Sequence, residues 1–530
     1  MRDMHTSRTQ TLSNASSEPW DLIVVGGGIT GAGILREAAR RKLKVLLLEQ
    51  QDFAWGTSSR SSQMVHGGLK YLTQGHIKLT YVSVGERQNL MQELPGLVGY
   101  LGMMMATYKE MGAFRFIVQL GLIVYDLMGK KLRRHAYSVN EVRQSLPGIR
   151  EHNLRGGLLF NESTTDDARL TFRVLDQARD DGGVALNYCR VIDLVVTKGR
   201  VSGVVAEDIL SGQTHSLQAR QVINATGAWA DRLRGKVASD KSKHMRPLRG
   251  SHLLFSAERI PLKQSVVLTH PVSKKPGFAN LWEGRVIVGS TDIDHTENLD
   301  REPAITQTEV DYMLQSINHY FPDLHLTEAD VISSWSGVRP VIDSGNADPS
   351  KESRDHAVWD EEGLLTITGG KLTTFRVIAL DALQAVQATL GPLPALTRDQ
   401  AIFSPISKVP ALPSGMSQTT LAILLGRYGN KTQALLDAAQ PGELESIPGS
   451  RRLWAELRWA AMHEDVHFLA DLMLRRTRLA VLLADGGAAI LPRVRSICQP
   501  LLGWDDAHWQ QEEAAYLELV KRCYSLPSRH

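Results

Sequence analysis

The chain has 530 residues, of which 43% are apolar and 22% are charged. That balance is typical of a large folded protein and excludes a disordered, fibrous or multi-span membrane chain. Its 60 basic and 57 acidic residues give a formal net charge of +3, so no strong field favours a nucleic-acid partner. The three cysteines, Cys189, Cys498 and Cys523, are far apart, which indicates neither a disulfide framework nor a thiolate metal site.

The first residues of the chain, 1–18, are rich in Ser, Thr and Asn and contain no apolar stretch. They show no secretory signal and are expected to form a frayed tail. Together with the unpaired cysteines, this predicts a reducing, cytoplasmic compartment.

The clearest architectural signal lies at residues 21–49. An apolar run (LIVV) leads into a glycine cluster, a helix-like segment follows over residues 29–41, and a second apolar run (VLLL) ends at Glu49. This order predicts one βαβ unit. Short β-branched runs then recur over residues 184–223 and continue to Gly370, which indicates antiparallel or mixed strands.

A change of composition marks the C-terminal part. Residues 403–418 (FSPISKVPALPSGMSQ) carry three prolines and almost no charge, which is typical of a linker. Beyond it, residues 419–530 are rich in Leu, Ala, Glu and Arg at helical spacing and are expected to form a separate helical domain.

The glycine cluster fits a dinucleotide-binding motif. Gly26, Gly28 and Gly31 follow the pattern G-x-G-x-x-G, in which the backbone can approach a pyrophosphate and the helix N-terminus favours its charge. Glu49 stands where it can accept hydrogen bonds from ribose hydroxyls, which argues against the 2′-phosphate of NADP. A lone glycine motif can be an ordinary tight turn, but strand, helix and acid stand in register here. We therefore predict dinucleotide binding.

A loop of small residues follows Glu49. Taken alone it would be a solvated Ser-rich loop, but it offers many hydroxyl and N–H groups to a ligand. The loop runs Gly56, Thr57, Ser58, Ser59, Arg60, Ser61 and Ser62, and HGGLKY follows at residues 66–71.

These segments carry a family resemblance. The chain resembles the FAD-dependent, quinone-linked (aerobic) glycerol-3-phosphate dehydrogenase family. The motifs run in family order across about 350 residues, and they are IVVGGGITGAG, DFAWGTSSRSSQMVHGGLKYL, TTDDARL (164–170), NATGAWAD (224–231), RGSHLLF (249–255), GSTD (289–292), SGVRP (336–340) and GGKLTTFR (369–376). The helical tail, with RYG at 427–429 and RRT at 475–477, is similar to the family's C-terminal domain.

The resemblance implies an α/β fold with three parts. A glutathione-reductase-type (Rossmann-like) FAD-binding domain would comprise residues 19–85, about 150–245 and 335–400. A mixed-sheet cap domain with the substrate site would comprise about 86–149 and 246–334, and the C-terminal domain would be all-helical. The implied reaction is oxidation of sn-glycerol 3-phosphate to dihydroxyacetone phosphate, with electrons passed to a quinone. An oxidase that reduces O2 instead is an open alternative, and the chain is compatible with a homodimer.

The resemblance also assigns the cofactor contacts. The small residues at 224–227 let a strand end pass close to FAD, and GGKLTTFR would close over the isoalloxazine with a helix N-terminus toward it. The residues implied to bind FAD are Gly26, Gly28, Gly31, Glu49, Gly56, Thr57, Ser58, Ser59, Ser61, Ser62, Thr226, Gly227, Gly370, Lys371, Leu372 and Thr373.

A dianionic substrate requires cations that stay charged when desolvated. Arg339, Lys371 and Lys70 are the candidates, with Tyr71 as a neutral donor and Arg354 as a further cation. Position 70 is Lys where many family members have Arg. Lysine keeps the positive charge but cannot make the two parallel hydrogen bonds that an arginine guanidinium makes to a phosphate.

Catalysis is expected from two residues. His252 matches the family's active-site histidine and would act as the base, or as a hydrogen-bond partner, for the substrate hydroxyl. Arg339 would stabilise the developing alkoxide. His252 could instead be a structural histidine on a strand, since most of the 17 histidines have no catalytic role.

One motif argues for another class of protein. His463-Glu464-Asp465-Val466-His467 satisfies H-E-x-x-H, the signature of a zinc metallopeptidase. It lies in the helical tail without an obvious third ligand, so we predict no metal. A flavin-binding module without turnover is the other alternative.

A quinone acceptor requires access to a bilayer. Residues 116–125 (FIVQLGLIVY) reach about half of the ~20 apolar residues that a spanning helix needs. Flanked by Arg115 and by Lys130, Lys131, Arg133 and Arg134, they could lie on a membrane surface or be a buried cap helix. The expected location is peripheral, on the cytoplasmic face of the inner membrane.

Overall fold

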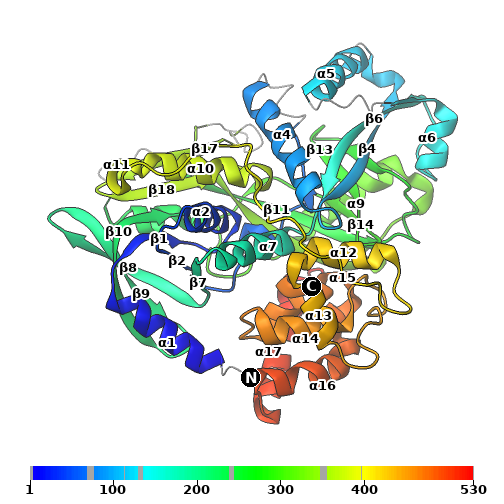
Figure 1. Ribbon diagram of the computed structural model, residues 1–530. Coiled ribbons are helices and arrows are strands. Elements are labelled where there is room, and N and C mark those ends of the chain that lie inside the picture. Colours follow the sequence, from blue (N-terminus) through cyan, green and yellow to red (C-terminus); the bar gives the residue numbers. More distant parts are fainter. Residues whose placement is uncertain are drawn as a thin grey trace.

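The computed structural model describes residues 4–68, 77–112, 114–128, 135–237, 244–345, 352, 355–395 and 397–528. Two sheets lie side by side in this part of the chain, and a set of helices at the C-terminal end packs below them (Figure 1).

The first sheet is built on parallel strands in the order β18, β10, β1, β2, β7, with β17 antiparallel at one edge. Val24 of β1 pairs with Leu47 of β2 and with Ile223 of β10, so the carboxyl ends of the three strands meet at one edge. The near-continuous apolar sequences of β1 and β2, and of the last residues of β10, reflect burial on both faces. The strands are β1 (Trp20–Val25), β2 (Val45–Leu48), β7 (Val184–Leu186), β10 (Gln213–Asn224), β17 (His356–Glu361) and β18 (Leu364–Gly369).

Helices cover one face of this sheet, where Leu35, Leu175 and Ile378 pack on Val24 and Leu47. They are α2 (Ile29–Ala39), α7 (Asp167–Asp180) and α10 (Phe375–Ala385). The other face carries an antiparallel extension of β10 with β9 (Arg200–Asp208) and β8 (Cys189–Thr197). The short helices α8 (Ala230–Arg234) and α11 (Gln387–Leu390) flank the sheet.

The N-terminal segment differs from the expected frayed tail. It forms α1 (Met4–Ser17), which packs through Leu12 and Ala15 on the face of the first sheet that β8 and β9 cover. The indole of Trp20 donates to the Ala15 carbonyl at 3.0 Å. Two buried apolar side chains and this hydrogen bond hold a helix that composition alone does not reveal.

The second sheet has the order β15, β11, β14, β13, β12, β4, β6, β3, with β16 beside β11 and β5 beside β6. The strands β3 and β6 and residues 335–342 of β16 thus join this sheet, although the resemblance placed these segments in the FAD-binding domain. The strands are β3 (Met64–Val65), β4 (Gly99–Tyr108), β5 (His135–Tyr137), β6 (Leu154–Thr164), β11 (Met245–Ser256), β12 (Ser265–Thr269), β13 (Pro276–Trp282), β14 (Arg285–Gly289), β15 (Ile293–Asp294) and β16 (Val331–Ile342).

Helices pack on both faces of the second sheet. α6 (Val139–Ser145) and α9 (Gln307–Tyr320) share one apolar core with it, and Val118 and Leu122 of α5 (Phe114–Met128) belong to another. α4 (Ile77–Glu93) lies against α5 and against the N-terminal turn of α10, so it bridges the two sheets.

The C-terminal helices are joined to the first sheet by buried ion pairs. Arg475 and Arg476 both contact Asp52, which follows β2, and Arg169 of α7 pairs with Glu464 at 2.8 Å. The described residues between 391 and 417 form neither helix nor strand, as a linker requires. The helices are α12 (Gln418–Tyr428), α13 (Thr432–Ala438), α14 (Trp454–His463), α15 (Leu479–Leu482), α16 (Leu491–Leu502) and α17 (Asp506–Cys523).

Candidate active site

A cavity of about 1410 Å³ is lined by residues of both sheets. At one end it meets the carboxyl ends of β1, β2 and β10, and from there it continues along β4, β6 and β12. In a doubly wound sheet, ligands bind at the carboxyl ends of the strands, so this cavity is the expected ligand site.

The glycine turn at the start of α2 forms one wall. Gly28 lines the cavity, and a Cβ there would lie 3.1 Å from Ser58 Oγ, which accepts from the Ile29 N–H at 2.9 Å. Gly26 has a φ of +112°, which favours glycine. Gly31 does not line the cavity; a Cβ there would lie 1.8 Å from the Gly26 carbonyl oxygen, so it lets helix and turn pack.

Glu49 lies at the end of β2, beside this turn. Its carboxylate accepts from the Gly27 N–H at 2.6 Å and from the Gln51 N–H at 2.8 Å. Burial raises the pKa of Glu49, and the two backbone donors oppose that effect. The acid therefore lies where the sequence predicted an acceptor for ribose hydroxyls.

The Ser-rich loop forms the next part of the wall. Its backbone is anchored by the Thr57 hydroxyl, which donates to the Val338 carbonyl, and by the Ser61 N–H, which donates to Asp167 at 2.8 Å. Ser59 is buried behind the cavity wall. The loop residues that line the cavity are Gly56, Thr57, Ser58, Arg60, Ser61 and Ser62.

Two further backbone segments close around the cavity. Thr226 and Gly227 follow β10, and the Thr368 hydroxyl of β18 donates to the Gly227 carbonyl at 3.1 Å. Gly370, Lys371, Leu372 and Thr373 also line the cavity, directly before α10, so that helix presents its N-terminus to the ligand.

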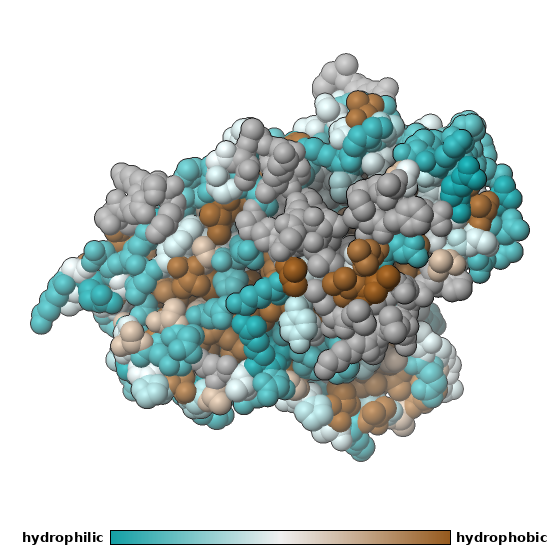
Figure 2. All heavy atoms as spheres, turned by 90° about the horizontal axis from the view of Figure 1, so that it is seen from above, coloured by the Kyte–Doolittle hydropathy of each residue, from teal (hydrophilic) through white to brown (hydrophobic). Residues whose placement is uncertain are grey.

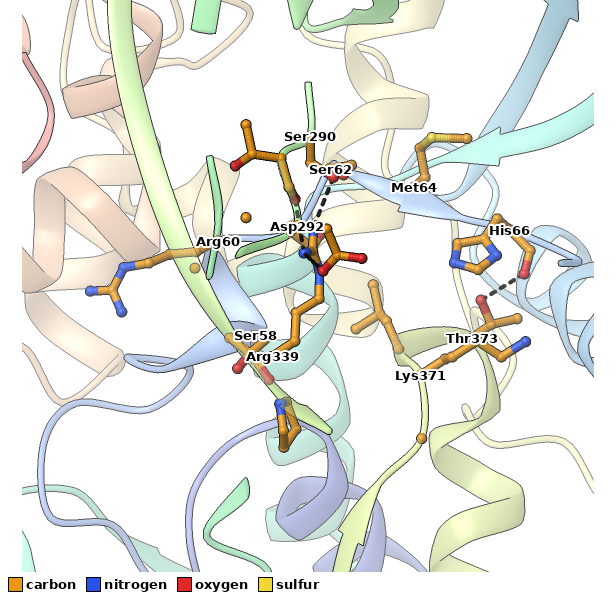
Figure 3. Close-up of a pocket in the computed structure, with 18 of the residues that line it drawn as sticks. Ser58, Arg60, Ser62, Met64, His66, Ser290, Asp292, Arg339, Lys371 and Thr373 are labelled. Carbon is orange, nitrogen blue, oxygen red and sulfur yellow. Dashed lines mark hydrogen bonds and ion pairs between the residues drawn. The ribbon is translucent and has the colours of Figure 1, made fainter. Parts of the chain in front are cut away.

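Arg339 projects from β16 into the cavity wall. Its guanidinium donates to Asp292 Oδ1 at 3.0 Å, to the Thr291 carbonyl at 3.1 Å and to Ser290 Oγ at 2.8 Å (Figure 3). Gly250 of β11 makes room for it, because a Cβ there would lie 2.2 Å from the guanidinium. The side chain is thus held in one orientation while it still borders the cavity.

His252 lies behind the wall. Its Nε2 is 2.8 Å from Ser62 Oγ, its ring stacks on Trp335 at 5.1 Å between centroids, and Ser62 stands between the imidazole and the cavity. Burial, and then the positive charge of Arg339, lower the pKa of His252 to about 3. The imidazole is therefore neutral at neutral pH, and its contact with the Ser62 hydroxyl links it to the cavity wall.

Lys371 lines the cavity on the side opposite Arg339 in Figure 3. Its ammonium donates to Ser83 of α4 at 2.6 Å, and burial lowers its pKa to about 8. The other predicted substrate contacts, Lys70, Tyr71 and Arg354, lie outside the described residues.

Several cavity residues were not assigned a role from the sequence. His66 lies in the HGGLKYL motif and residues 290–292 lie in the GSTD motif. Both motifs carry the family resemblance, so the sequence contained a signal that could have identified these residues. Glu162 of β6 had no such signal, because its place on the wall depends on the pairing of β6 with β4.

The H-E-x-x-H segment does not form a metal site. α14 ends at His463, Asp465 has a φ of +48°, and Glu464 is engaged by Arg169, so the two histidines are not on one helical face. Within the described ranges no group of three or more His, Cys, Asp or Glu side chains could hold a metal ion.

Comparison with known proteins decides the family. The model for FAD dependent oxidoreductases matches residues 21–376, and that for the C-terminal domain of alpha-glycerophosphate oxidase matches residues 380–509. The aerobic glycerol-3-phosphate dehydrogenase of Bacillus subtilis (strain 168) is 35% identical over 496 residues, which cover 89% of this chain and 89% of that relative. The chain belongs to the FAD-dependent glycerol-3-phosphate dehydrogenase family.

Two solved structures agree with the fold. The glycerol-3-phosphate dehydrogenase from Bacillus halodurans, complexed with FAD, is 26% identical and superposes with a TM-score of 0.74 over 97% of both chains. The L-alpha-glycerophosphate oxidase from Mycoplasma pneumoniae, with FAD bound, has a TM-score of 0.58 and 18% identity over 73% of this chain and 98% of that chain. The second similarity shows the fold alone. The expected α/β fold with a C-terminal helical domain is confirmed.

The residues that line the cavity fit FAD as the family's cofactor. Gly28 leaves the space that a Cβ would fill, the N-termini of α2 and α10 both face the cavity, and Glu49 stands at the end of β2. These groups supply a neutral cradle for a pyrophosphate and an acceptor for a ribose. The chain is accordingly a FAD-dependent oxidoreductase.

Proposed function

We propose that the protein oxidises sn-glycerol 3-phosphate to dihydroxyacetone phosphate and passes the electrons to a quinone. The observation that carries the proposal is the pair of cations on the cavity wall. Arg339 and Lys371 border the same cavity as the FAD-binding turns, and a small phosphate dianion is a ligand that both can bind.

FAD, held by the glycine turn and the Ser-rich loop, would supply the acceptor for a hydride from the substrate carbon. The chain's own residues then have two tasks, which are to hold the phosphate and to take the hydroxyl proton. Arg339, fixed by Asp292 and Ser290, offers positive charge to an oxygen that loses its proton.

Two histidines are candidates for the proton. His252 would act through Ser62, which supports the hydrogen-bond role predicted for it more than the role of direct base. His66 lines the cavity itself, and its carbonyl is fixed by the Thr373 hydroxyl at 3.1 Å. We propose that His66 is the second candidate for the base.

A quinone acceptor would require contact with a bilayer. No helix in the described part of the chain is long and apolar enough to cross a membrane. The outer sides of α4 and α5 expose apolar side chains, and Figure 2 views this side of the molecule, with brown apolar patches among hydrophilic ones. The exposed residues are Ile77, Tyr81, Leu120 and Val124. This supports a peripheral contact on the cytoplasmic face of the inner membrane.

Turnover assays test the proposal. With a water-soluble acceptor dye, sn-glycerol 3-phosphate should be converted to dihydroxyacetone phosphate, whereas glycerol should react poorly because it lacks the phosphate. Rapid formation of hydrogen peroxide in air would favour the oxidase over the quinone-linked dehydrogenase. No product with any acceptor would overturn the proposal.

A further inference from the structure

A buried polar cluster reaches the cavity wall through one of its members, and its three residues come from three different elements. Glu162 of β6, Arg87 of α4 and Tyr125 of α5 are 4%, 6% and 1% exposed. Arg87 donates to Glu162 and to the Tyr125 hydroxyl, and that hydroxyl donates to Glu162, all at 2.8 Å. A buried carboxylate held in this way is fixed in position and charge-compensated.

Glu162 also binds the backbone of the site. It accepts from the Gly67 N–H at 2.9 Å and lines the cavity. Gly67 packs so closely on the cluster that a Cβ there would lie 2.1 Å from the Tyr125 hydroxyl oxygen. The cluster therefore sets the position of the turn that carries His66.

The neighbouring residues of this turn are fixed in the same way. Thr373 donates to the His66 carbonyl at 3.1 Å, and Thr80 donates to the Gly68 carbonyl at 3.4 Å. Between them, the Gly67 N–H donates to Glu162. Removing any of these three hydrogen bonds should make the His66–Gly68 turn more mobile at the cavity wall.

From these contacts we propose that Glu162, held by Arg87 and Tyr125, is a positioning residue of the substrate site, which fixes the His66–Gly68 turn on the cavity wall that Lys371 also lines. The proposal rests on the proposed function, because Lys371 is taken there as a phosphate-binding cation. It goes beyond that function by adding a residue group that nothing in the motifs assigns.

The charge argument depends on what surrounds Lys371. Burial lowers the pKa of Lys371, and the negative charges of Glu162 and then Asp355 oppose that effect. Among the other charged groups on the packed elements, Glu86 of α4 is paired with Arg376 of α10 at 2.7 Å. Arg87 forms an ion pair with Glu162 at 2.8 Å and so compensates the negative charge of that carboxylate. Removing the Glu162 charge should therefore lower the pKa of Lys371 and weaken substrate binding at alkaline pH.

Glu162→Gln tests this, because the amide keeps the shape and can still accept from Gly67. Relative to wild type, the KM for glycerol 3-phosphate should rise about tenfold near pH 8.5 and about twofold or less near pH 6.5, where Lys371 is protonated in both proteins. Tyr125→Phe removes one hydrogen bond to Glu162 but leaves the Glu162 charge in place. We therefore expect it to lower kcat without the rise in KM at alkaline pH that Glu162→Gln should show.

The chain offers a matched control. Glu456 accepts from Arg427 at 3.0 Å, from the Tyr428 hydroxyl at 2.9 Å and from the Leu453 N–H at 2.9 Å, but it does not line the cavity. Glu456→Gln should lower the melting temperature and leave the pH dependence of KM unchanged.

A second readout does not depend on turnover. After reductive methylation with labelled formaldehyde, the Lys371 resonance, identified by its loss in Lys371→Arg, should titrate at lower pH in Glu162→Gln than in wild type. A KM ratio that is constant with pH, or an unchanged Lys371 titration, would overturn the proposal. Failure of the proposed function would look different, since the wild type itself would not oxidise glycerol 3-phosphate.

Discussion

Gly28 borders the cavity at the N-terminus of α2 with a φ of −79°, so what the glycine supplies is space and not an unusual backbone conformation. A valine there would press on Ser58 and extend into the region where a pyrophosphate must lie. We predict that Gly28→Val is purified largely without flavin, as measured by the ratio of flavin to protein absorbance. Gly85 has open space around it, so Gly85→Val is the control that should retain FAD.

Arg339 is held in the cavity wall by Asp292 and Ser290. If it stabilises developing charge on the substrate oxygen, Arg339→Ala should lower kcat/KM at least ~100-fold while bound FAD stays at the wild-type level. Steady-state kinetics and the flavin spectrum measure the two effects separately. Near-normal kinetics would mean that the substrate is bound elsewhere.

The sequence located residues whose backbone or charge defines a motif, such as Gly28, Glu49 and Arg339, and all three line the cavity. It could not show that His252 lies behind Ser62, because that depends on the pairing of β11 with β16. Glu162 stands in no motif at all, and its partners come from two other elements.

At the scale of elements, the C-terminal helices depend on a charge cluster under β2. Burial alone would raise the pKa of Asp52, but Arg476 and Arg475 outweigh it and hold that pKa at about 2. Arg476→Ala would leave a buried carboxylate short of a partner, and we expect a loss of about 3–5 kcal/mol in the free energy of unfolding. Urea unfolding measures it; a loss below about 1 kcal/mol would show that the cluster does not hold the domain.

The same cluster makes the folding stability depend on pH in the acid range. The folded pKa of Asp52 is depressed, so its contribution to stability is present above the unfolded pKa of about 3.9 and is lost as pH falls toward about 2. The melting temperature of wild type should therefore fall in this window. In Asp52→Asn that part of the pH dependence should be missing.

The outer face of α5 is the element through which we expect membrane contact. Leu120 is 62% exposed there, and Val272, on a loop after β12, is 72% exposed. Wild-type protein should co-sediment with anionic liposomes, more weakly at high salt, and Leu120→Glu should reduce binding while activity with a soluble dye persists. Val272→Glu should bind as wild type does. Equal binding by both variants would remove α5 from the contact. Lys130, Lys131, Arg133 and Arg134, expected beside this helix, lie outside the described residues.

Local sequence patterns predicted some helices and strands correctly and failed to predict others. The βαβ unit follows from local patterns and is present as expected. The Pro-rich segment at residues 403–418 forms no helix or strand before Gln418. α1 was missed because it is stabilised by tertiary contacts of Leu12 and Ala15 and not by an amphipathic pattern. The H-E-x-x-H segment is not helical throughout, because Glu464 ends α14 to reach Arg169.

For the whole molecule, the site exists only where the two sheets meet. Residues from 25 to 373 contribute to one cavity, and the chain passes between the sheets several times to bring them there. The family resemblance predicted this discontinuity, but the exchange of β3 and β6 into the second sheet followed only from strand pairing.

The most direct test of the proposed function is anaerobic reduction of the purified holoprotein by substrate. We predict a FAD absorbance spectrum that sn-glycerol 3-phosphate bleaches with one equivalent per flavin, while glycerol and inorganic phosphate leave it unchanged. A flavin spectrum that glycerol 3-phosphate does not bleach, in protein whose flavin is reduced normally by dithionite, would contradict it.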